Sequence, residues 1–183
     1  MAAAVGARIR STRVACRISL GSLASATGLG KGTLSELERG LRNPTLDTLF
    51  AIATCLDLPL SQLLVDDDAA GRGAPDAIHA SGQSVDALLV DRWADVAALV
   101  EVYRLTISQE TRHSLSHAPG VVEVLTVITG HVEVGVEGDT VHLRSAESHR
   151  FEGDRPHLYR GIAEKSSAIL VMRYAMPDRV HES

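Results

Sequence analysis

The segment from Ser19 to Thr45 constrains the fold more than any other part of this 183-residue chain. Its first residue can cap a short amphipathic helix, and Gly28 can end that helix in a left-handed backbone conformation. A second amphipathic helix is predicted to begin near Lys31, and Asn43-Pro44-Thr45 then turns the chain into a third. Two helices joined by so short a turn must cross steeply.

A set of positions in this segment carries a family resemblance. They are Leu23-Ala24, Gly28, Thr33-Leu34-Ser35, Glu38-Arg39-Gly40 and Asn43-Pro44. In this order they resemble the phage-repressor-like Xre family of helix-turn-helix domains. The resemblance covers Val5 to Leu64 and implies a five-helix unit with further helices at Leu46 to Cys55 and Leu60 to Leu64. Arg13 and Glu38 resemble the family's internal ion pair, so we expect them to join the first helix to the third.

The second helix of such a unit is the one expected to read DNA. Its N-terminal part enters the major groove, where side chains reach base edges and amides meet phosphate. The candidate DNA-binding residues are Gly30, Lys31, Gly32, Thr33, Ser35, Glu36, Asn43 and Thr45. Many relatives carry a phosphate-binding Gln where this chain has Leu20. A single module with so few polar readers binds weakly, so we expect a homodimer on a two-fold symmetric operator of double-stranded DNA.

Charge separates the chain into two parts. Residues 1–65 contain seven Lys plus Arg against four Asp plus Glu, whereas the remainder contains eleven against nineteen. Only the first part suits a polyanion. Residues 66–76, DDDAAGRGAPD, have no hydrophobic period and are predicted to be a linker. We therefore expect a helix-turn-helix domain at 1–65, the linker at 66–76 and an effector and dimerisation domain at 77–183.

The sequence gives no indication of membrane insertion or export. No apolar stretch approaches the roughly 18 residues of a membrane span, and the first ten residues lack the apolar core of a secretory signal. We expect a soluble, cytoplasmic protein with no membrane partner. Cys16 and Cys55 fall on apolar helix positions and are predicted to be buried thiols.

Beyond the linker the hydrophobic pattern changes from helical to alternating. Strands are predicted at Ser84 to Val90, Ala98 to Ile107, Val122 to Ile128, His131 to Val136, Thr140 to Leu143, His157 to Arg160 and Ala168 to Tyr174. Turn residues separate them, which favours a closed barrel or a two-sheet jelly roll. A helical turn around Asp91 to Asp95 remains an alternative for that segment.

Two stretches of this second half carry a further resemblance. The first runs from His117 to Gly130 and the second from Leu143 to His157. They resemble the two motifs of the small cupin barrel, over about Val100 to Tyr174, and imply an α+β chain of a five-helix domain followed by an all-β cupin. The family's ligands map onto His117, Glu123 and His157, which would hold one divalent metal. The usual H-x-H is absent, and Ala146-Glu147 replaces a familiar Gly-Asp.

The residues themselves also favour a site at Glu123. Glu123 lies near the start of the apolar strand VVEVLTVI. Burying its carboxylate there is costly unless a cation or a hydrogen-bond donor contacts it. Two imidazoles and a carboxylate suit Zn, Fe(II), Mn or Ni. The alternative is a polar pocket without metal, in which His157, Arg150 or a bound ligand meets the carboxylate. Ligand-pocket candidates are His113, His149 and Tyr159.

These features favour a transcriptional regulator, a repressor and not an enzyme, whose barrel senses a small-molecule effector or a metal. The principal alternative is a metal-dependent cupin enzyme of the dioxygenase, epoxidase or isomerase type. In that case His117, Glu123 and His157 would form a facial triad with open coordination positions. A third alternative treats the barrel as a dimerisation platform without a ligand.

Overall fold

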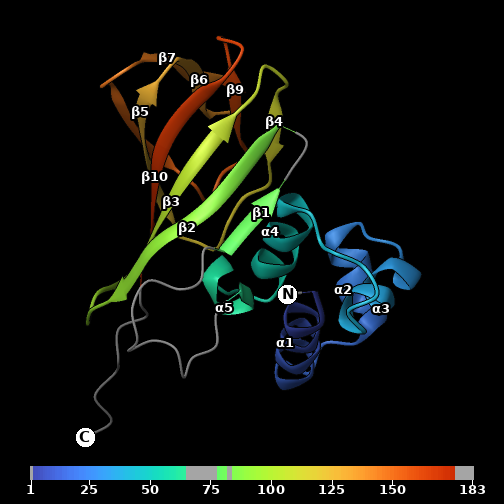
Figure 1. Ribbon diagram of the computed structural model, residues 1–183. Coiled ribbons are helices and arrows are strands. Elements are labelled where there is room, and N and C mark those ends of the chain that lie inside the picture. The colour runs from blue at the N-terminus through green and yellow to red at the C-terminus, as the bar shows by residue number, and fades with distance from the viewer. Residues whose placement is uncertain (1, 65–77, 82–83, 176–183) are drawn as a thin grey trace, which may run out of the picture. The chain divides into compact units, whose positions relative to one another are not determined.

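The computed structural model describes residues 2–64, 78–81 and 84–175, with only the backbone of 78–81 (Figure 1). Residues up to 64 and residues from 84 onward fall into two compact units, each described here by itself. The predicted linker at 66–76 lies outside the described residues.

The N-terminal unit consists of five helices. They are α1 (Ala2–Ala15), α2 (Leu20–Thr27), α3 (Lys31–Glu38), α4 (Leu46–Cys55) and α5 (Leu60–Leu64). Ser19 caps α2 by accepting a hydrogen bond from the Ser22 amide, and Gly28 ends it at a φ of 68°. A Cβ at Gly6 would lie 2.1 Å from the Leu37 carbonyl oxygen, so this glycine allows α1 and α3 to approach closely. No described helix has the length and apolar character needed to cross a membrane.

The C-terminal unit is built from antiparallel strands in two sheets. They are β1 (Ile78–Ser81), β2 (Val85–Ala94), β3 (Ala98–Ile107), β4 (Arg112–Ser114), β5 (Val122–Thr129), β6 (His131–Val136), β7 (Asp139–Arg144), β8 (Ser148–Glu152), β9 (His157–Gly161) and β10 (Ser166–Ala175). One sheet has the order β1-β2-β3-β10-β5-β8 and the other β4-β9-β6-β7. The α+β class, five helices followed by a cupin-like jelly roll, is confirmed.

One local alternative and one local prediction were wrong. The segment Asp91 to Asp95 does not form a helical turn, because β2 continues to Ala94 after a bulge between Leu89 and Asp91. Cys16 is exposed instead of buried, since α1 ends at Ala15 and the cysteine falls in the turn that follows. Cys55 is half-buried and also carries a free thiol.

The six-stranded sheet aligns one row of inward-facing residues. Met172 on β10 pairs with Glu101 on β3 and with Glu123 on β5, and Glu123 pairs with Phe151 on β8. All four side chains are buried. The strand register therefore places two carboxylates inside the barrel, on either side of a methionine.

Candidate functional site

The α2–α3 pair presents a mostly polar surface at the start of α3. Gly30 is the N-cap residue and offers no side-chain cap. Lys31, Gly32 and Glu36 are exposed, and Thr33 and Ser35 are half-buried. Leu34 and Leu37 are buried on the opposite side of α3, so the hydrophobic contacts orient the polar side of the helix outward.

Two further candidates lie between α3 and α4. Asn43 and Thr45 are both exposed, and the Thr45 hydroxyl caps α4 by accepting a hydrogen bond from the Thr48 amide. Arg42 was not predicted as part of the site. Its guanidinium lies 3.8 Å from the Glu36 carboxylate, with both side chains about half exposed. This pairing partly offsets the repulsion that Glu36 would exert on a phosphate.

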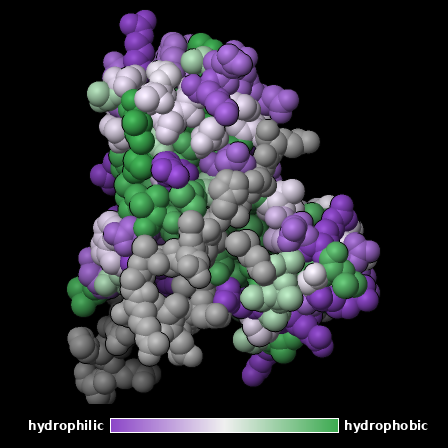
Figure 2. All heavy atoms as spheres, in the orientation of Figure 1, coloured by the Kyte–Doolittle hydropathy of each residue, from purple (hydrophilic) through white to green (hydrophobic). Residues whose placement is uncertain are grey.

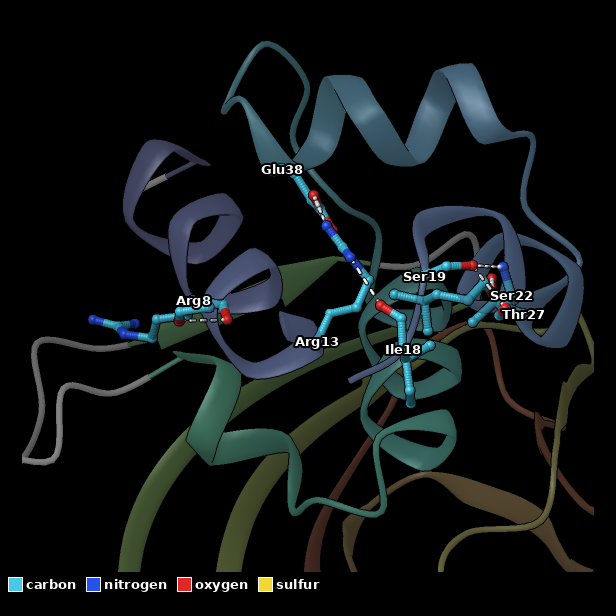
Figure 3. A network of polar contacts seen from close by, with 9 residues as sticks. Arg8, Arg13, Ile18, Ser19, Ser22, Thr27 and Glu38 are labelled. Atoms are coloured by element: carbon cyan, nitrogen blue, oxygen red, sulfur yellow. Dashed lines mark hydrogen bonds and ion pairs between the residues drawn. The ribbon is translucent and has the colours of Figure 1, made fainter. Parts of the chain in front are cut away.

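Arg13 holds the helical unit together from inside (Figure 3). Its Nε and Nη2 donate to Glu38 at 2.6 and 2.9 Å, and its Nη1 donates to the Ile18 carbonyl at 2.9 Å. The hydrogen bonds that Arg13 donates to Glu38 raise the pKa of Arg13. The side chains of Arg13 and Glu38 are 12% and 7% exposed, so the expected internal ion pair is present and has a structural role.

The cupin-like barrel gathers His117, Glu123 and His157. One ligand atom from each lies within 4.8 Å of the others, and all three residues are buried. Glu123 Oε1 is 3.0 Å from His117 Nε2 and 3.4 Å from His157 Nε2. Such spacings fit donors that surround one cation with bonds of about 2.0–2.2 Å.

Two of the atoms that could coordinate a cation make no hydrogen bond. Among the described residues, Glu123 Oε1 and His157 Nε2 are buried without a hydrogen-bond partner. His157 Nδ1 lies 2.8 Å from the Arg155 carbonyl oxygen, which favours a proton on Nδ1 and a lone pair on Nε2. Buried polar atoms without partners are rare in folded proteins. The donor set and its two free atoms therefore fit a divalent metal.

Electrostatics favour the forms of Glu123 and His157 that bind metal. Burial by itself would raise the pKa of Glu123, but the neighbouring His117 and His157 rings and the Tyr159 hydroxyl outweigh it and lower this pKa to about 2. Burial lowers the pKa of His157. A charged carboxylate beside a neutral imidazole is the combination that coordinates a divalent cation.

The backbone around Gly153 positions two of the three ligands. The His117 amide donates to the Gly153 carbonyl at 2.9 Å, and the Gly153 amide donates to the Val121 carbonyl at 2.9 Å. A Cβ at Gly153 would lie 2.8 Å from Glu123 Oε1. This glycine was missed from the sequence, although it lies inside the second cupin-like motif.

The pocket candidates separate into different environments. The Tyr159 hydroxyl donates a hydrogen bond to Glu123 Oε2, and burial raises the Tyr159 pKa well above its usual value. His149 stacks on Phe151, which contacts the rings of His157 and Tyr159. His113 does not join the group, because it is exposed and its Nδ1 lies 2.7 Å from Glu137. Arg150 is exposed too, so the donor to Glu123 is Tyr159 instead.

A second buried carboxylate, Glu101, was not anticipated. Its Oε2 accepts hydrogen bonds from the hydroxyls of Tyr103 at 2.6 Å and Tyr174 at 3.2 Å. The alternation Leu99, Glu101, Tyr103, Leu105 on a predicted strand was the available signal, since every second residue shares a face. Glu101 is thus bound to the barrel's own hydroxyls.

Comparisons with known proteins identify the family of this chain. The helix-turn-helix family model matches residues 9–63. The chain is 31% identical over 149 residues to the HTH-type transcriptional regulator SutR of Escherichia coli (strain K12), covering 81% of this chain and 82% of SutR. It is 34% identical over 90 residues to the transcriptional regulator ClgR of Mycobacterium tuberculosis, covering 45% of this chain and 80% of ClgR.

A solved structure matches across both units. The crystal structure of an HTH_3 family transcriptional regulator from Vibrio cholerae superimposes with a TM-score of 0.76 at 26% identity, covering 94% of this chain and 96% of that one. The likeness to SutR likewise extends well beyond the five helices. The chain belongs to the Xre-type helix-turn-helix transcriptional regulators, and in this chain a cupin-like β domain follows the five helices.

Proposed function

We propose that this regulator binds its operator as a homodimer and that a divalent metal held by His117, Glu123 and His157 anchors a small-molecule effector in the barrel. The observation that carries the proposal is that Glu123 Oε1 and His157 Nε2 are buried without a hydrogen bond, while Glu123 Oε1 lies 3.0 Å from His117 Nε2. Zinc, iron, manganese and nickel all accept two imidazoles and a carboxylate. A bound metal would supply open coordination positions for an effector.

The reading surface is proposed to be the exposed side of α3 with its flanking residues. Lys31, Thr33, Ser35 and Glu36 would reach base edges, while the Gly30 and Gly32 backbone, Asn43 and Thr45 would contact the sugar-phosphate chain. An effector can change operator affinity only if it binds one dimer arrangement better than another. The two reading helices would then move relative to each other.

Operator binding is tested with the full chain and the promoter region next to its gene. We expect sequence-specific binding that weakens steeply with salt, because basic side chains replace counterions on phosphate. Lys31→Ala and Thr33→Ala should each weaken operator binding and relax the sequence preference, because both side chains would contact base edges. Lys165→Ala, exposed between β9 and β10, is the matched control. Absence of specific binding with and without metal would reject the proposal.

Metal content is tested by elemental analysis of the purified protein. We expect about one divalent ion per chain in the wild type and much less in Glu123→Gln, which keeps the shape of the side chain but loses its charge. Stoichiometric redox-active iron that is oxidised with a substrate would instead favour the enzyme. Wild-type protein that binds none of the four metals would reject a metal centre.

A further inference from the structure

The outer face of the six-stranded sheet carries an apolar cluster. Its residues, called the valine face below, are Val100 and Val102 on β3, Val122 and Val124 on β5, and Ile169 and Val171 on β10, all half-buried. Figure 2 shows hydrophobic side chains gathered over β2, β3 and β10. Exposed Trp93, 48% accessible on β2, pairs with Val100 and extends the cluster.

The strand register arranges this face in rows. Val171 pairs with Val102 on one side and with Val124 on the other. The same row ends in Asp91 on β2, which pairs with Val102, and in Arg150 on β8, which pairs with Val124. Both end residues are exposed. From β2 to β8 this row therefore contains one negative side chain, three apolar side chains and one positive side chain on five neighbouring strands.

We infer that the valine face is the surface through which two copies of this chain associate, face to face, about a two-fold axis that runs along β10. Such an axis lays each row against the same row of the partner in reversed strand order. Val171 then meets its own copy, and Asp91 lies opposite Arg150 of the partner subunit. Stacked sheets lie about 10 Å apart, a gap that a long arginine side chain can span to reach a carboxylate.

Charge selects this axis over the other face-to-face arrangement. An axis running across the strands would place Asp91 against Asp91 of the partner subunit, and like charges in contact oppose association. The chosen axis also brings Arg173 of β10 opposite its own copy, which is one like-charge approach against two attractive contacts between Asp91 and Arg150. The inference rests on the proposed operator-binding homodimer and specifies the surface that forms it.

The first test measures the dimer dissociation constant of the full chain by sedimentation velocity at low salt. Asp91→Arg and Arg150→Asp should each weaken the dimer about tenfold or more, because each variant places like charges together at both ends of the row. An equimolar mixture of the two variants should form a heterodimer of near wild-type stability, since both contacts become attractive again. Weakening in each variant alone, together with rescue in the mixture, is the result that an Asp91 to Arg150 contact across the axis predicts.

Matched controls separate this contact from a general effect of charge. Glu164→Arg and Lys165→Asp reverse exposed charges between β9 and β10 and should change the constant less than twofold. Val171→Glu places a carboxylate at the centre of the face and should weaken the dimer about a hundredfold or more. Val96→Glu, at a fully exposed turn position, should leave the dimer intact. Retained metal content in Val171→Glu would show that its barrel is folded.

The outcomes distinguish the surface from the proposed function. Unchanged dimers of Val171→Glu, or a mixture that fails to rescue, would overturn the valine face while an operator-binding dimer formed elsewhere would survive. A wild-type chain that stays monomeric at all concentrations and occupies its operator as a monomer would overturn both. A monomeric Val171→Glu variant with weakened operator binding would support both.

Discussion

Gly153 and Glu123 lie so close that an added methyl group would overlap Oε1, the carboxylate oxygen that lies beside His117 and His157. A Cβ at Gly153 would stand 2.8 Å from Glu123 Oε1 and 3.0 Å from Glu123 Cγ. The glycine is therefore part of the wall against which the carboxylate is held. We expect Gly153→Ala to displace Glu123 and to weaken metal binding about 10- to 100-fold, the range typical when the support of a ligand is lost.

The measurement for Gly153→Ala is metal affinity by competition with a chelator, in protein shown to be folded by circular dichroism. Glu152→Ala, which changes the exposed neighbouring side chain, is the control and should bind metal normally. Wild-type affinity in Gly153→Ala would mean that the carboxylate moves without loss and that the close contact is incidental.

Tyr159 is expected to orient the Glu123 carboxylate by binding Oε2, the oxygen that does not face the histidines. Its hydroxyl donates to Glu123 Oε2, so Tyr159→Phe removes a donor while keeping the buried ring. We predict about a tenfold loss of metal affinity. Tyr103→Phe is the matched control, because the Tyr103 hydroxyl binds Glu101 instead. Equal losses in the two variants would indicate a general effect of removing a buried hydroxyl.

Ala146 adopts a backbone conformation that favours glycine. Its φ is 69°, in the turn between β7 and β8 where related barrels were expected to carry Gly. The left-handed conformation costs an L-residue about 1–2 kcal/mol, and the extra freedom of unfolded glycine cancels part of any gain. We expect Ala146→Gly to raise the free energy of unfolding by about 0.5–1 kcal/mol in urea denaturation. Ala94→Gly, at the end of β2, should lower it instead.

The Arg13–Glu38 pair should contribute to stability more than an exposed pair. Arg13→Ala leaves a mostly buried carboxylate without its guanidinium, and we expect a loss of about 3 kcal/mol in the free energy of unfolding of the helical unit. Arg155→Ala breaks an exposed pair with Glu152 and should cost less than about 0.5 kcal/mol. Similar small losses in both would contradict a structural role for Arg13.

Tyr103 should make stability depend on alkaline pH. Burial and the charge of Glu101 raise the Tyr103 pKa well above that of an exposed tyrosine. Because the folded state disfavours the phenolate, this contribution is complete below the unfolded pKa of about 10 and is lost as pH rises above it. Urea denaturation of wild type and Tyr103→Phe across that range should show a weaker alkaline decline in the variant. If the free energy of unfolding declined equally with pH in both proteins, Tyr103 would not be the group responsible.

Local sequence determined most of the secondary structure. Capping by Ser19 and Thr45, the turn glycine at position 28 and alternating apolar residues in the second half predicted the helices and most strands correctly, since these signals act over a few residues. Burial of Glu123 followed from its apolar strand. Strands β1, β4 and β8 were not predicted, because segments of 4, 3 and 5 residues contain too little periodicity to define a strand.

Only the tertiary structure decided which side chains meet. Alternate residues of β4 face opposite sides of the sheet, and Arg112 faces inward while His113 faces outward. The sequence of a three-residue strand does not determine which of the two faces inward. Glu101 meets Tyr174, 73 residues away, because β3 pairs with β10 in one particular register. The same register builds the row from Asp91 to Arg150. Such contacts depend on strand pairing between distant segments, which local residue patterns do not specify.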